Sequence, residues 1–215
     1  LLTGNEDPHF ADASPSFIRT IANADIVCSI GLELEVGWLP KALSRSGNAK
    51  VQTGGKGFCE TGNSVTVLEK PTGKVDRSMG DVHGAGNPHF LLSPRALSQA
   101  AGAVAESLIS NRPEKEAYFS ANLKAFQDSM RKLEERIRLK LKPVIEISKT
   151  RPVVIEYHKQ FTYFFDLYGL KSLGAIEEKP GVPPAAARLA QVGARAREAK
   201  ILLALGTPHT PDQHL

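Results

Sequence analysis

Seven apolar residues recur at steps of four or three within residues 114–142, and this pattern constrains the fold more than any other. They are Phe119, Leu123, Phe126, Met130, Leu133, Ile137 and Leu141. The spacing predicts one amphipathic helix of about 43 Å, which Pro143 is expected to end. A helical hairpin or coiled-coil arm would need a second matching stripe, and we find none. We therefore interpret residues 114–142 as a backbone helix that joins two lobes.

The segment after this helix alternates between strand and helix patterns. Strand patterns lie at 152–155, 173–176 and 201–205, and helix patterns at 161–168 and 183–198. Gly169 is expected to close the first of these helices, and the run 201–205 to be almost wholly buried. The alternation predicts a parallel sheet covered by helices.

The segment before the long helix mixes the same elements. Ser14 and Ser93 each precede a proline and are expected to cap helices. A buried strand is expected at 25–30, residues 32–39 are expected to lead into a helix with the only tryptophan, and another strand is expected at 50–52. The predicted fold class is α/β, with two small lobes of parallel sheets covered by helices. Its parts are an N-terminal lobe (1–113), the linker helix (114–142) and a C-terminal lobe (143–215).

Composition excludes several classes of protein. The 215 residues carry a net charge of +4, and their Lys and Arg are dispersed, so we expect no nucleic-acid partner. No apolar run reaches the roughly 18 residues of a membrane span. The first residues do not resemble a signal peptide, so the protein is either cytoplasmic or already processed. Cys28 and Cys59 would pair in an exported protein and stay as small buried hydrophobes in a cytosolic one.

Four of the six histidines stand in turns or at the ends of elements. His83 and His89 lie in the Gly-rich stretch 80–90, His9 follows Asp7-Pro8, and His158 ends an apolar run. Neutral imidazole is a common metal ligand, and zinc accepts three of them with one oxygen ligand. This arrangement suggests one metal site. The spacing also permits other readings: His9 as an exposed turn residue, His158 as a core histidine, and only one of His83 and His89 as a ligand.

Enzymatic motifs are missing. The sequence has no His-Glu-x-x-His and no Gly-x-Ser-x-Gly motif, and Gly54-Gly55-Lys56-Gly57 lacks the spacing of a phosphate loop. Carboxylates are available at Glu33, Glu35, Glu177 and Glu178, but such pairs are commonly solvated edges. We therefore expect that the protein is not an enzyme.

Several motifs occur in a fixed order along nearly the whole chain. They are Asp7-Pro8-His9, Gly31-Leu32-Glu33-Leu34-Glu35 with Trp38-Leu39, Gly86-Asn87-Pro88-His89-Phe90 with Ser93-Pro94, and Glu156-Tyr157-His158 with Phe161, Tyr163-Phe164 and Tyr168-Gly169-Leu170. This order resembles the periplasmic zinc and manganese substrate-binding proteins of ABC uptake transporters. The resemblance implies two lobes joined by a long helix, with the metal in a cleft between them.

By the same resemblance, the metal ligands are His9, His89 and His158. Manganese-selective relatives tend to carry a carboxylate in place of His158, so the resemblance implies Zn²⁺ more than Mn²⁺. It implies a periplasmic or lipid-anchored protein that delivers metal to a membrane permease, and an oxidising compartment in which Cys28 and Cys59 can pair. The alternatives are a surface adhesin with a structural metal and a zinc hydrolase.

The sequence also departs from this family. The chain is expected to be truncated at both ends, since relatives begin with an additional strand and helix and end with another. No residue matches the C-terminal acidic fourth ligand, and Asp212, His209 and His214 lie too early for that role. We expect the loop 53–85 to be a flexible flap that contains a short strand at 64–69. His83, in the company of Asp76 and Asp81, is a possible auxiliary ligand.

Overall fold

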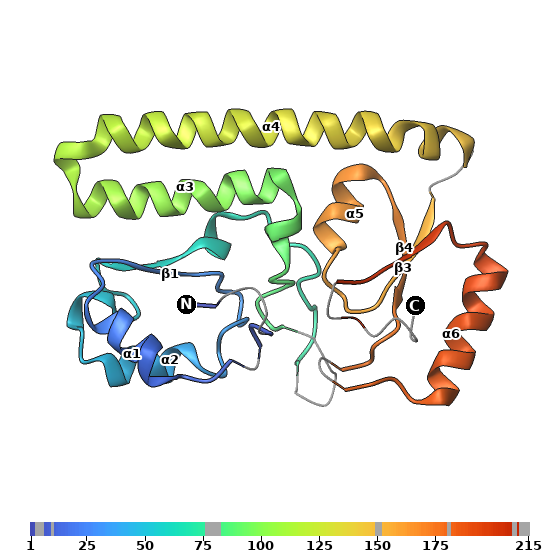
Figure 1. Ribbon diagram of the computed structural model, residues 1–215, viewed down its shortest axis with the longest axis horizontal. Helices are drawn as coiled ribbons and strands as arrows, with labels where there is room; N and C mark the ends of the chain where they lie inside the picture. Colours follow the sequence, from blue (N-terminus) through green and yellow to red (C-terminus); the bar gives the residue numbers. More distant parts are fainter. Residues whose placement is uncertain are drawn as a thin grey trace.

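The helix α4 (Glu116–Ile147) extends over both lobes of the molecule, as Figure 1 shows. The computed structural model describes residues 1–2, 7–9, 11–75, 83–148, 152–179, 182–207 and 210. In the middle of α4, Glu134 accepts a hydrogen bond from Arg95 at 2.6 Å, and its carbonyl oxygen accepts one from the Tyr168 hydroxyl at 3.5 Å. One turn of the helix therefore contacts both lobes.

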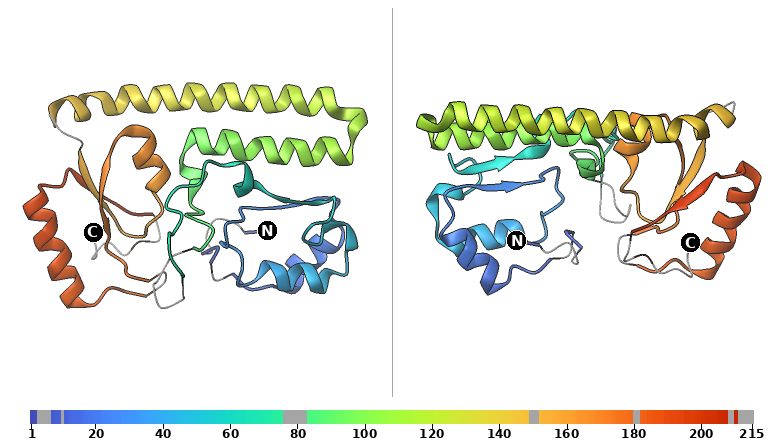
Figure 2. Two further views of the ribbon diagram at one scale, coloured as in Figure 1. Left: turned by 180° about the vertical axis from the view of Figure 1, so that it is seen from behind. Right: turned by 45° about the horizontal axis from the view of Figure 1, so that its top comes forward.

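The first half of α4 packs against α3 (Pro94–Asn111), which lies antiparallel beneath it (Figures 1 and 2). Gln127 donates a side-chain hydrogen bond to the Ser98 carbonyl across this pair. Apolar residues of α3 and of the first turns of α4 line one pocket, which Ile30 and Thr61 also line. The hairpin that we set aside is thus present in this half of the helix. The second stripe, which includes Leu97, Ala101, Val104 and Leu108, lies in α3.

The N-terminal lobe contains α1 (Pro15–Ala22), β1 (Val27–Ser29), α2 (Leu39–Ser46) and β2 (Phe58–Glu60). The predicted cap at Ser14 is confirmed, because its hydroxyl accepts the Phe17 N–H at 3.3 Å. Likewise, the Ser93 hydroxyl accepts the Ala96 N–H at 3.4 Å at the start of α3. The buried core beneath the sheet consists of Ile21, Trp38, Leu39, Ala42, Leu43 and Val51.

β1 and β2 pair in parallel, with Cys28 opposite Cys59, and the two residues form a disulfide. This resolves the alternative that the sequence left open. The sequence did not predict β2, because its three residues lie in a Gly-rich stretch without an alternating pattern.

The C-terminal lobe contains β3 (Val153–Glu156), α5 (Thr162–Tyr168), β4 (Lys171–Ala175), α6 (Ala186–Ala199) and β5 (Leu203–Leu205). Its strands form a parallel sheet of order β4-β3-β5. Successive side chains of a strand point to opposite faces. Accordingly, Val154 packs with Phe165 of α5, and Ile155 with Val192 of α6. The predicted α/β fold with a long helix is confirmed, and Gly169 closes α5 in the left-handed conformation.

Pro143 does not end the long helix, contrary to the prediction. It lies inside α4, which continues to Ile147. Proline cannot donate a hydrogen bond to the preceding turn, but the residues after it resume the pattern. The Ser148 N–H donates to the Val144 carbonyl at 3.3 Å.

Tertiary contacts override three further predictions. Residues before Leu39 form turns instead of a helix, because the Glu35 carboxylate accepts the N–H groups of Ile30 and Gly31 at 2.7 and 3.1 Å. Ala49–Val51 is a 3₁₀ turn capped by Asn48, not a strand. Residues 64–69 do not form a strand either, since the Thr66 and Leu68 N–H groups bond to side chains of α3 and α5.

The last predicted strand is only partly buried. Leu202 and Leu203 are 46% and 42% exposed, because β5 is an edge strand that pairs with β3 alone among the described strands. The apolar composition of residues 201–205 therefore did not predict their burial. None of the helices in the described part of the chain is long and apolar enough to span a membrane.

Candidate metal centre

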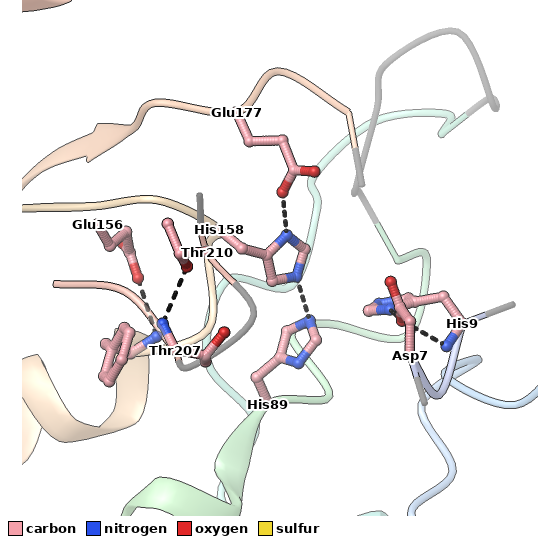
Figure 3. A network of polar contacts seen from close by, with 9 residues as sticks. Asp7, His9, His89, Glu156, His158, Glu177, Thr207 and Thr210 are labelled. Carbon is pink, nitrogen blue, oxygen red and sulfur yellow. Dashed lines mark hydrogen bonds and ion pairs between the residues drawn. The ribbon is translucent and has the colours of Figure 1, made fainter. Parts of the chain in front are cut away.

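Three histidines from distant parts of the chain meet at the junction of the two lobes (Figure 3). His9 lies in the turn before α1, and its backbone N–H donates to Asp7 Oδ1 at 2.9 Å. His89 precedes the 3₁₀ turn Phe90–Leu92, and its N–H donates to Asn87 Oδ1 at 2.9 Å. His158 follows the carboxyl end of β3. Short-range hydrogen bonds thus orient the backbone at the first two positions, and the sheet positions the third.

The ring nitrogens of these histidines converge. One nitrogen from each of His9, His89 and His158 lies within 4.8 Å of the other two, and His89 Nε2 is 3.3 Å from His158 Nε2. Zinc–nitrogen bonds of about 2.0–2.1 Å in a tetrahedron separate two ligand nitrogens by about 3.3 Å. The closest pair already has this spacing. The donor set fits a zinc ion, with at most about 1.5 Å of contraction from the 4.8 Å limit to the tetrahedral spacing.

A carboxylate contacts the far side of two of these rings. Asp7 Oδ1 lies 2.7 Å from His9 Nδ1, and Glu177 Oε2 lies 2.9 Å from His158 Nδ1. Burial raises the pKa of Asp7, but the hydrogen bonds and charge of His9 outweigh it and hold that pKa below its usual value. Both contacts are made by Nδ1, so a metal would be bound by Nε2. Such carboxylates commonly orient metal-binding histidines.

His83 lies beside this group without joining it. Its ring centroid is 5.6 Å from that of His9 and 6.2 Å from that of His89, but it is not among the three residues whose nitrogens converge. The next residue, Gly84, donates its N–H to Glu33 Oε2 at 2.7 Å. Asp76, Asp81, His209, Asp212 and His214 lie outside the described residues.

A network of polar contacts joins the lobes next to the histidines. Glu69 Oε2 accepts hydrogen bonds from Asn87 Nδ2 at 2.9 Å and from the Thr162 hydroxyl at 3.2 Å. Its other oxygen pairs with Lys159 Nζ at 2.8 Å. The Tyr163 hydroxyl donates to the Asn87 carbonyl at 2.7 Å. Asn87 and Lys159 are close neighbours of His89 and His158 in the chain, so this network fixes the positions of those two histidines relative to each other.

Glu156, at the end of β3 and two residues before His158, is wholly buried. One carboxylate oxygen accepts the Phe161 N–H at 2.9 Å at the start of α5, and the other accepts the Ser172 hydroxyl at 3.1 Å. Burial raises the pKa of Glu156 to about 7, because these hydrogen bonds offset only part of the desolvation. This carboxyl fixes the turn that carries His158.

We did not assign Glu177 to the site from the sequence, because we interpreted the carboxylates at 177 and 178 as solvated side chains. The Glu177 side chain is in fact only 6% exposed. The signal was in the topology: Glu177 follows β4 as His158 follows β3. The carboxyl ends of adjacent parallel strands meet at one edge of a sheet, where ligand sites form.

Comparison with known proteins places this geometry in context. The family model described as "Zinc-uptake complex component A periplasmic" matches residues 1–214. The chain is 26% identical to the high-affinity zinc uptake system protein ZnuA of Yersinia pestis, over 97% of this chain and 67% of that protein. It is also 26% identical to the zinc-binding lipoprotein AdcA of Streptococcus pneumoniae, over 94% of this chain and 38% of that protein.

The fold is shared with a solved structure. A crystal structure of ZnuA superposes with a TM-score of 0.78 at 24% identity, over 100% of this chain and 75% of that one. The present chain thus spans about two thirds of the length of the Yersinia relative and a smaller part of the streptococcal one.

Proposed function

The chain belongs to the family of periplasmic zinc-uptake complex component A proteins, and we propose that it captures zinc with His9, His89 and His158 and delivers it to an ABC permease. One observation carries the assignment of the ligands: the nitrogens of these three residues converge within 4.8 Å. Because they come from both lobes, bound metal would bridge the lobes at their junction.

Zinc suits this site better than manganese. Imidazole nitrogen is a favoured ligand of zinc, whereas manganese prefers carboxylate and carbonyl oxygen. The residue at 158 is a histidine, where manganese-selective relatives tend to carry a carboxylate. The zinc-related names of the Yersinia and streptococcal relatives support the same metal.

Three histidines leave one position of a tetrahedron to be filled. Within the described part of the chain, the metal-binding group consists of His9, His89 and His158. We propose that water completes the coordination, and that His83, whose ring stacks on that of His9, acts as an auxiliary ligand. A site open at one position can release its ion more readily than a closed one.

We further propose that residues 1–113 and 143–215 act as two lobes on the frame of the helix predicted at 114–142, which continues to Ile147 as α4. The family description names a component of an uptake complex, which agrees with the expectation that the protein is not an enzyme. We therefore do not pursue the hydrolase alternative. The relatives named above are zinc-uptake and zinc-binding proteins, and none of these names favours the adhesin alternative.

Metal content and zinc affinity test the capture site. We expect one zinc per chain, measured by elemental analysis, with the affinity determined by competition against a chromogenic chelator. His89→Ala and His158→Ala should each abolish tight binding while the circular dichroism spectrum stays unchanged. Unchanged affinity in both variants would overturn the ligand assignment.

Delivery requires a separate experiment. The full-length protein, added to vesicles that contain the matching permease, should stimulate uptake of radioactive zinc in the presence of ATP. The His158→Ala variant should not. A protein that binds zinc tightly but leaves uptake unchanged would restrict the function to capture.

A further inference from the structure

Glu177 has no role in the function as described so far, yet its carboxylate contacts a proposed ligand directly. We propose that Glu177 is a positioning residue that fixes the tautomer and ring orientation of His158, so that its Nε2 atom faces the metal. This inference rests on the proposed zinc site. Figure 3 shows Glu177 on one side of the His158 ring and His89 on the other.

The backbone holds Glu177 in place through the extension of the sheet. The N–H of Glu177 donates to the Tyr157 carbonyl at 2.9 Å, and the N–H of Ile176 donates to the Glu156 carbonyl at 2.9 Å. These bonds continue the pairing of β3 with β4 beyond its last strand residues. Glu177 and His158 therefore keep a constant relative position at the edge of the sheet.

A side chain of helix α6 also holds the backbone just before Glu177. The Arg188 guanidinium donates to the Ala175 carbonyl at 2.7 Å and to the Ile176 carbonyl at 3.3 Å. These carbonyls lie immediately before Glu177. This half-buried guanidinium bonds to the two residues before Glu177 and so limits the motion of the backbone that carries the carboxylate.

The contact with His158 has a defined chemical consequence. A carboxylate only accepts hydrogen bonds, so the Nδ1 atom that lies 2.9 Å from Glu177 must carry the proton. When the ring is neutral, this proton leaves its lone pair at Nε2, which is the atom that lies 3.3 Å from His89 Nε2. Glu177 thus selects the tautomer in which Nε2 can coordinate.

Burial distinguishes this contact from the similar one at His9. The Glu177 side chain is 6% exposed and that of His158 is 16% exposed, whereas the Asp7 side chain is 43% exposed. Water competes poorly for a buried hydrogen bond, which is therefore stronger than an exposed one. Asp7 is also two residues from His9 and belongs to the same turn. We therefore assign the larger orienting effect to Glu177.

Two substitutions separate the orienting role from the charge. Glu177→Gln keeps an oxygen acceptor for Nδ1 and removes the negative charge, whereas Glu177→Ala removes both. The neighbouring Glu178→Gln is the matched control, because the Glu178 side chain is 65% exposed and lies 3.9 Å from Arg188 Nε. It makes the same chemical change outside the site.

The first readout is the tautomer of His158 in the metal-free protein, from NMR of the imidazole nitrogens. We expect protonation at Nδ1 in the wild type and Glu178→Gln, and loss of this preference in Glu177→Ala. Zinc affinity should fall about 10- to 100-fold in Glu177→Ala and less in Glu177→Gln. If Glu177→Ala does not fold, the intermediate effect of Glu177→Gln on both readouts decides the question.

An unchanged tautomer in Glu177→Ala would overturn the orienting role. A changed tautomer with unchanged zinc affinity would overturn its relevance to the metal. Failure of the proposed function gives a different result, since a wild type that binds no zinc still reports the tautomer of His158 in the NMR experiment.

Discussion

His89 Nε2 and His158 Nε2 lie 3.3 Å apart across the junction of the lobes, although 69 residues separate them in the chain. This is about the separation that two nitrogens have when they bind one tetrahedral zinc ion. The pair can therefore share an ion without a large movement of one lobe against the other. The contacts of Glu69 with Asn87, Thr162 and Lys159 maintain that arrangement.

The histidines should contribute unequally to zinc binding. His89→Ala removes one of three converging nitrogens, so we expect its effect to exceed the roughly 100-fold loss that removal of a supporting partner can cause. His83→Ala should weaken binding by less than about 10-fold, because His83 is outside the converging group. Chelator competition on both variants measures the difference. Equal losses would mean that His83 is a full ligand.

The network at Glu69 should influence zinc affinity from outside the site. Glu69→Ala removes the acceptor of Asn87, Thr162 and Lys159. We therefore expect the relative position of His89 and His158 to change and the zinc affinity to fall about 10-fold. The control is Glu146→Ala, which removes an exposed carboxylate 3.7 Å from Lys142 Nζ. Calorimetric titration with zinc measures both variants. Equal affinities of Glu69→Ala and the control would show that the network does not position the histidines.

Buried Glu156 should make stability depend on pH. Its pKa is raised from 4.5 to about 7, so the folded protein holds this proton more tightly than the unfolded chain. Its contribution is therefore complete below the unfolded pKa and decreases as the pH rises through about 7, in total by up to about 3 kcal/mol.

Glu156→Gln carries a permanently neutral side chain and should remove this dependence. Denaturant unfolding of the metal-free protein at about pH 5 and about pH 8 measures the free energy of unfolding at the two ends of the range. We expect the variant to lose less stability than the wild type between them. Parallel changes in the two proteins would contradict the raised pKa.

The disulfide should stabilise the N-terminal lobe without affecting the metal site. Cys28 and Cys59 close a loop of sequence separation 31, which corresponds to about 3–4 kcal/mol of unfolding free energy in the chain-entropy model. The double variant Cys28→Ser, Cys59→Ser should lose about this amount in denaturant unfolding. Its zinc affinity should stay close to that of the wild type, since the strands that carry the cysteines, β1 and β2, carry none of the histidines of the site. A large loss of zinc affinity would show that the pairing of β1 with β2 influences the position of His9 or His89.

Local patterns in the sequence predicted the elements of the fold that depend on near neighbours. The apolar repeat predicted the long helix, because residues three and four apart share a helix face. The serines at 14 and 93 predicted helix starts, because each hydroxyl bonds to an N–H three residues later. The fixed order of motifs around His9, His89 and His158 led to the family, and through it to the ligand set that we propose.

The contacts between residues far apart in the chain were decided only by the tertiary structure. The convergence of three histidines, the pairing of Cys28 with Cys59 and the burial of Glu177 depend on how strands and helices are placed in space. The same holds where predictions failed: Glu35 holds a turn before Leu39 through hydrogen bonds, and the edge position of β5 leaves Leu203 exposed. Periodicity reports which side of an element is apolar. The path of the whole chain determines which elements cover the apolar side and which polar groups lie near it.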